Sequence, residues 1–135
     1  MDIVEIKHLK KHFRNGTQVV KALDGIDLSI EKGKFTAIVG ASGSGKTTLL
    51  NTIAGLYSPT EGSVIVDGLN LASMDDEQLT VFRRRKIGFV FQGYNLVPEL
   101  TIRENIIFPL ALDGSRPDTE YFSHLVHLLG LDGHL

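Results

Sequence analysis

Apolar and polar residues alternate along the N-terminal part of this chain in the way that strands do. Residues 26–30 alternate with a period of two, which predicts a strand with one solvent-facing side. Residues 3–13 carry apolar side chains at mixed spacing, and the Asn15-Gly16 pair that precedes residues 18–23 favours a tight hairpin turn. We therefore expect an antiparallel β-layer in this part of the chain.

Two later apolar runs show no such alternation. Residues 35–39 and 87–91 are largely apolar at successive positions, which is typical of strands buried on both faces of a parallel sheet. Between them, residues 63–66 predict a short strand that ends at the Asp67-Gly68 turn. The pattern predicts an α/β fold, with an antiparallel β-subdomain and a mostly parallel core sheet.

Helix signals separate these strands. One helix should begin near Lys46 and end at Ala54, where Gly55 can supply a left-handed cap. A second should open at Ser73, with an acidic residue at the third position of a capping box, and continue to about Arg85. Both helices would follow a predicted strand, as in an α/β fold.

Two further helices are expected near the C-terminal end. Thr101 and Glu104 have the spacing of a capping box, so a helix should begin there and run towards residue 112, with Pro109 as a kink. Residues 118–129 form an amphipathic pattern that ends at Gly130. These helices would make a helical subdomain that begins near residue 101.

One stretch carries most of the chemical information. It lies between residues 35–39 and the first predicted helix and reads Gly40-Ala41-Ser42-Gly43-Ser44-Gly45-Lys46-Thr47-Thr48, which matches the pattern Gly-x-x-x-x-Gly-Lys-Thr. A buried strand, a glycine loop and a helix N-terminus in this order are the context that a P-loop requires. We therefore predict a phosphate-binding site here.

The residue types in this loop suit a polyphosphate with a divalent cation. Gly40, Gly43 and Gly45 can take positive φ and let backbone N–H groups converge on an anion without a Cβ in the way. The helix N-terminus adds unpaired N–H groups and the positive end of its dipole. Lys46 would supply a cation for the β- and γ-phosphates, and the Thr47 hydroxyl would coordinate Mg²⁺.

Composition narrows the class of partner. With 42% hydrophobic and 22% charged residues, the 135-residue chain has the composition of one globular domain or part of one. The net charge of −2, with residues 83–86 as the one basic run, gives no electrostatic argument for nucleic acid, so we expect no nucleic-acid partner.

The absence of cysteine excludes disulfides and thiolate metal sites. The N-terminus lacks a signal-peptide layout, so a cytoplasmic location is expected.

Together with the hairpin that precedes it, the glycine loop resembles the nucleotide-binding subunit of ATP-binding cassette (ABC) transporters, as do residues 90–98 (Val-Phe-Gln-Gly-Tyr-Asn-Leu-Val-Pro). Residues 100–106 and 108–110 resemble more narrowly the ATPases of the lipoprotein-release and macrolide-export type. The resemblance covers essentially all 135 residues. It implies the N-terminal part of one P-loop NTPase domain of the ABC type, peripheral on the inner face of the cell membrane.

The resemblance also implies individual roles. Phe13 takes the place of the aromatic residue that stacks on adenine, although an ordinary hairpin aromatic stays an alternative, and Gln92 takes that of the Q-loop glutamine, a ligand of Mg²⁺. Residues 93–104 would contact a transmembrane permease subunit, and a second nucleotide-binding subunit would complete a dimer around ATP. The expected set for ATP and Mg²⁺ is Phe13, Gly40, Ser42, Gly43, Ser44, Gly45, Lys46, Thr47, Thr48 and Gln92, with Thr47 and Gln92 at the metal.

Several motifs of that family are not found in this sequence. Residues 1–135 contain no signature segment, Walker B aspartate, catalytic glutamate or switch histidine. We therefore expect a truncated nucleotide-binding domain that binds ATP and Mg²⁺ but has no catalytic residue of its own. Open edges at residues 35–39 and 87–91 would favour self-association over a stable monomer.

Two other functions remain open at this point. A small P-loop kinase or GTPase would share the glycine loop, although the chain has no base-reading Asn-Lys-x-Asp motif. A non-catalytic nucleotide-binding module would bind ATP without turnover. ATPase activity measured beside equilibrium nucleotide binding would separate these functions from that of an intact ABC subunit, which turns over ATP unaided.

Overall fold

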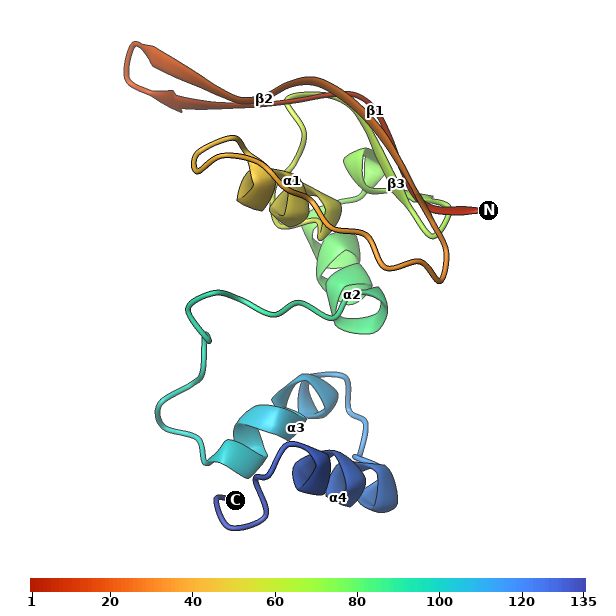
Figure 1. The fold of residues 1–135 in the computed structure, drawn as a ribbon, viewed down its shortest axis with the longest axis vertical. Helices are drawn as coiled ribbons and strands as arrows, with labels where there is room; N and C mark the ends of the chain where they lie inside the picture. Colours follow the sequence, from red (N-terminus) through yellow and green to blue (C-terminus); the bar gives the residue numbers. More distant parts are fainter. The chain divides into compact units, whose positions relative to one another are not determined.

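The computed structural model describes residues 1–135 as two compact units, each of which is described by itself (Figure 1). The first, Met1–Ile87, contains β1 (Asp2–Asn15), β2 (Gln18–Glu31), α1 (Lys46–Ile53), β3 (Glu61–Val66), β4 (Leu69–Asn70), the 3₁₀ helix η1 (Leu71–Ser73) and α2 (Asp76–Lys86). The second, Gly88–Leu135, contains α3 (Ile102–Leu112) and α4 (Thr119–Leu128).

The first unit is built on an antiparallel sheet of four strands in the order β2-β1-β3-β4. β1 and β2 form a long hairpin that turns at Gly16, and its register pairs Asn15 with Gln18 and Phe13 with Val20. The expected antiparallel layer is confirmed. β2 is one continuous strand over the two predicted segments, residues 18–23 and 26–30.

A β-bulge explains the mixed apolar spacing of β1. Ile6 and Leu9 are both buried although they lie three residues apart, and between them His8 has a φ of 49° and the register with β2 shifts. The extra residue changes the phase of the strand, so Leu9 returns to the core side. The displaced His8 N–H donates to Asp27 Oδ1 at 2.9 Å, and this bond lowers the pKa of the Asp27 carboxyl below its ordinary value.

Two helices cover one face of the sheet. In Figure 1, α1 and α2 lie on the same side of the strands, and Arg83 of α2 donates from Nη1 to the Gly55 carbonyl at the end of α1 at 2.7 Å. Gly55 has a φ of 71°, as expected for the left-handed cap of α1. The buried core consists of Val4, Ile6, Leu9, Leu23, Leu49, Val64, Val66, Leu71, Leu79 and Phe82.

The predicted start of α2 was wrong by two residues. Asp75 is the N-cap: its carboxylate accepts the Gln78 N–H at 2.8 Å, and the Gln78 side chain accepts the Asp75 N–H at 3.0 Å. Ser73 belongs instead to η1, where its hydroxyl donates to the Asn70 carbonyl at 2.8 Å. The Ser73 hydroxyl is therefore used by η1, and a glutamine closes the capping box that an acid was expected to close.

The helical signals of the second unit are confirmed. The Thr101 hydroxyl accepts the Glu104 N–H at 3.2 Å, and the Glu104 carboxylate accepts the Thr101 N–H at 2.7 Å, which lowers the pKa of Glu104. Pro109 lies inside α3, Asp118 caps α4, and Gly130 follows α4 with a φ of 68°.

The two expected parallel core strands are not formed. Residues 35–39 and 87–91 have no strand structure, and Phe35 and Val39 are 98% and 86% exposed. Only Ile38 and Ile87 of these runs pack against the core. A parallel strand needs neighbouring strands for its N–H and C=O groups and a covering layer on each face, and every strand pair in this structure is antiparallel. These apolar runs therefore lack the neighbours that their pattern requires.

The bulge in β1 predicts a position-specific effect of glycine replacement. A Cβ at Gly62 (φ 86°) would collide with the His8 carbonyl oxygen, whereas a Cβ at Gly68 (φ 76°) would meet nothing within 4 Å. Either alanine strains the backbone by about 1–2 kcal/mol. Gly62→Ala should cost about 1–3 kcal/mol more, because it forces β3 away from β1. Urea denaturation of both variants tests this, and equal losses of stability would contradict the close approach of the two strands.

The Asp27 hydrogen bond predicts a pH-dependent contribution to stability. Because folding lowers the pKa of Asp27, this contribution is present above the ordinary aspartate pKa of about 3.9 and is lost as pH falls through the lowered value. Asp27→Ala should therefore lower the urea midpoint at about pH 6 by more than it does at about pH 3. A difference between variant and wild type that is unchanged over this range would show that the carboxylate charge is unimportant at the bulge.

Candidate phosphate-binding site

The glycine loop leads directly into the N-terminus of α1. Gly43 and Gly45 have φ of 75° and 93°, and Gly45 is the N-cap residue of α1. The Ser44 N–H donates to the Ala41 carbonyl at 3.2 Å and closes a tight turn. The expectation of positive φ is confirmed at these two glycines but not at Gly40, where a Cβ would instead lie 2.9 Å from the Ser44 hydroxyl oxygen.

The loop rests directly on β2. A Cβ at Gly45 would lie 2.5 Å from the Ala22 carbonyl oxygen and 3.1 Å from Leu23 Cδ2. Leu23 is itself buried in the core, so the contact ties the position of the loop to the packing of the sheet. A side chain at Gly45 would lift the loop away from β2.

The N-terminus of α1 has no anionic or capping side chain. No side chain accepts its first N–H groups, and its first turn contains no acidic residue. By contrast, the first turns of α2, α3 and α4 each contain an acidic residue, and each helix is capped by a side chain, from Asp75, Thr101 and Asp118 respectively. The unpaired N–H groups and the positive dipole end of α1 therefore favour an external anion.

Lys46 adds an uncompensated positive charge at the same place. Its ammonium folds back over the loop and donates to the carbonyl oxygens of Gly40 and Ala41, at 3.0 and 2.6 Å, and to the Ser44 hydroxyl at 3.3 Å. All three acceptors are neutral, so no carboxylate balances the charge. A phosphate group would be a stronger partner for this ammonium than the neutral oxygens that hold it.

A cavity of about 350 Å³ lies beside these groups. The loop and α1 line it with residues 43–48, and β2 lines it with Val20, Lys21 and Ala22. Ser42 is exposed and does not line the cavity. The three β2 residues were missed by the sequence reasoning, although a glycine loop that packs on a hairpin strand must place some of that strand at its rim.

Phe13 does not line this cavity but lies close to it in the sheet. Its cross-strand partner Val20 does line the cavity, and paired residues of neighbouring antiparallel strands are about 5 Å apart and share a face. The Phe13 ring is 37% exposed and makes an edge contact with the Tyr57 ring, with 5.4 Å between centroids and 80° between planes. The partly exposed Phe13 ring is therefore next to a residue that lines the cavity.

Gln92 and residues 93–104 belong to the second unit. Gln92 is exposed, in the stretch that leads to α3. Asn105 fixes the end of this stretch: its side chain accepts the Val97 N–H at 2.8 Å and donates to the carbonyls of Val97 and Leu100 at 3.1 and 3.0 Å. Asn105 was not singled out from the sequence, because its partners are backbone groups.

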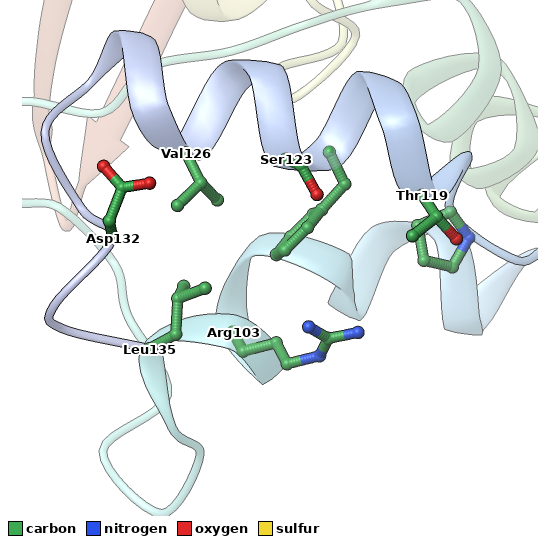
Figure 2. Close-up of a pocket in the computed structure, with 8 residues that line it drawn as sticks. Arg103, Thr119, Ser123, Val126, Asp132 and Leu135 are labelled. Carbon is green, nitrogen blue, oxygen red and sulfur yellow. The ribbon is translucent and has the colours of Figure 1, made fainter.

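The second unit has a smaller cavity of about 190 Å³ between α3 and α4 (Figure 2). Val126, Ser123 and Thr119 project into it from α4, and Arg103 extends from α3. The Arg103 guanidinium lies 4.9 Å from the centroid of the Phe122 ring, a cation–π distance that helps to hold the two helices together. The cavity therefore lies within the packing of the second unit.

Comparisons with known proteins identify the family. A model of the family described as "ABC transporter" matches residues 23–134. Over 115 residues the chain is 48% identical to the uncharacterized ABC transporter ATP-binding protein YvcR of Bacillus subtilis, covering 84% of this chain and 44% of that protein. It is 42% identical to the lipoprotein-releasing system ATP-binding protein LolD of Alcanivorax borkumensis, covering 85% of this chain and 50% of that protein.

The structural comparison agrees. The dimeric structure of the ATP-binding cassette MJ0796 bound to ADP and Pi superposes with a TM-score of 0.80 at 43% sequence identity, covering 87% of this chain and 51% of that one. The chain therefore belongs to the ABC transporter ATP-binding family and has part of its α/β cassette fold. It spans about half the length of the curated relatives YvcR and LolD. None of its helices is long and apolar enough to cross a membrane.

Proposed function

We propose that this chain binds ATP with Mg²⁺ at the glycine loop, as the nucleotide-binding part of an ABC transporter. The observation that carries the proposal is the uncapped N-terminus of α1 beside the uncompensated Lys46 charge, at a cavity of about 350 Å³. The cavity lies within the size range of small-molecule sites. The residues present fit a polyphosphate, because they offer donors and positive charge and no carboxylate.

In this proposal each part of the loop has a separate task. The N–H groups at the start of α1 bind phosphate oxygens, and Lys46 exchanges its carbonyl partners for the β- and γ-phosphates. The exposed Thr47 hydroxyl, which is followed by Thr48 on α1, and the Gln92 amide oxygen are the proposed ligands of Mg²⁺. When bound, Mg²⁺ neutralises charge on the phosphates. We assign no catalytic residue within residues 1–135, so we expect binding without turnover.

The proposed setting is a membrane complex. LolD belongs by name to a lipoprotein-releasing system, and MacB of Mannheimia succiniciproducens, 43% identical over 136 residues, is named a macrolide export ATP-binding/permease protein. MJ0796 is dimeric in its structure with ADP and Pi. By analogy we propose a partner permease that contacts residues 93–104, a second nucleotide-binding subunit, and a location at the cytoplasmic face of the membrane. ATP binding and hydrolysis would be coupled there to transport across the membrane or extraction from it.

Removal of the Lys46 charge tests the phosphate site. Lys46→Ala should abolish measurable ATP binding by isothermal titration calorimetry, because its ammonium is the cation at the loop. The circular dichroism spectrum should stay nearly unchanged, since Lys46 is not part of the core. Lys34→Ala, at an exposed lysine outside the cavity, is the matched control and should bind ATP like wild type. Unchanged ATP affinity in Lys46→Ala would contradict the assignment of the glycine loop as the phosphate-binding site.

Replacement of Phe13 tests the base site. If its exposed ring stacks on adenine, Phe13→Ala should weaken ATP binding by about 1–3 kcal/mol, while Phe13→Tyr and Phe13→Trp should retain it. Stacking tolerates any base, so GTP should bind within about tenfold of ATP. Equal ATP affinity in wild type and Phe13→Ala would show that Phe13 is an ordinary aromatic residue of the hairpin and does not stack on adenine.

A further inference from the structure

Two side chains, Tyr57 and Lys11, lie against the Phe13 ring. The Tyr57 ring meets it edge to face at 5.4 Å, and the Lys11 ammonium lies over both rings, 5.1 Å from the Phe13 centroid and 5.6 Å from the Tyr57 centroid. The same ammonium donates to the Ser58 carbonyl at 2.8 Å. We call Tyr57, Lys11 and the Ser58 carbonyl the aromatic clamp. Phe13 and Tyr57 are both partly exposed and do not belong to the buried core.

The aromatic clamp is anchored to the helix that carries the phosphate site. The Leu56 and Tyr57 N–H groups both donate to the Asn51 carbonyl of α1, at 2.8 and 3.3 Å, which fixes the turn behind the C-terminal end of the helix. Lys46 begins the same helix. An eight-residue helix is about 12 Å long, so one rigid element connects the proposed phosphate and base positions.

We propose that Tyr57 and Lys11 are positioning residues that hold the Phe13 ring in the orientation a nucleobase needs; this rests on the proposed function. A phenylalanine on a hairpin with 37% of its surface exposed would otherwise lose rotamer freedom when a base stacks on it. The edge contact and the cation over the ring restrict that freedom before the ligand arrives, so less entropy is lost on binding. The polyphosphate, which contacts the other end of α1, gains nothing from this arrangement.

The test compares ATP with inorganic tripolyphosphate, which has no base, by isothermal titration calorimetry on the purified chain. Tyr57→Leu should weaken ATP binding about 3- to 10-fold and leave tripolyphosphate binding unchanged, whereas Tyr57→Phe should keep both. Lys11→Met, which keeps the aliphatic stem, should weaken ATP binding about 2- to 5-fold without an effect on tripolyphosphate. Tyr121→Leu, at an exposed tyrosine of α4, is the control and should change neither affinity.

The possible outcomes distinguish failure of this inference from failure of the proposed function, ATP binding at the glycine loop. If wild type binds neither ligand, the proposed function and the inference both fail. If Phe13→Ala weakens ATP binding but Tyr57→Leu does not, the base site stands and the positioning role is overturned. Equal weakening of ATP and tripolyphosphate by Tyr57→Leu would also overturn it, because the residue would then act through the stability of α1.

Discussion

The contact between Gly45 and the Ala22 carbonyl of β2 is the constraint on which the site depends. No side chain fits there, so the loop can lie flat against the strand and start α1 beside it. The N-terminus of α1 is thereby placed next to Val20 and Lys21, and its unpaired N–H groups share one cavity with them. A helix N-terminus without a capping side chain leaves its first N–H groups without partners, which is unfavourable. A bound anion can accept hydrogen bonds from these groups.

The core and the site are linked through the same short helix. Leu49 and Thr52 of α1 are buried against the sheet, and the Thr52 hydroxyl returns a hydrogen bond to the Thr48 carbonyl at 2.7 Å. The sheet that receives them depends on the bulge at His8, which returns Leu9 to the core side. Packing in the core therefore decides where the helix ends lie, and each end carries one part of the proposed nucleotide site.

Residues 35–39 and 87–91, unlike the antiparallel sheet, lack the neighbouring strands that they need in order to form strands themselves. Their apolar composition is that of strands covered on both faces, yet most of their side chains are exposed, because no neighbouring strand pairs with them. The relatives YvcR and LolD are about twice as long as the matched region. The antiparallel subdomain and the glycine loop form without a parallel partner, since their contacts are local or lie within the first unit.

Local signals in the sequence were sufficient for the hairpin at Gly16, the glycine loop, the capping box of Thr101 and the glycine after α4. Each depends on backbone conformation or hydrogen bonds within a few residues, which residue type alone restricts. The bulge at His8, the cavity wall from β2 and the aromatic clamp depend instead on residues brought together by the tertiary structure. Lys11 and Tyr57 are far apart in the chain, and no local pattern relates them, because their contact follows from the packing of α1 against the sheet.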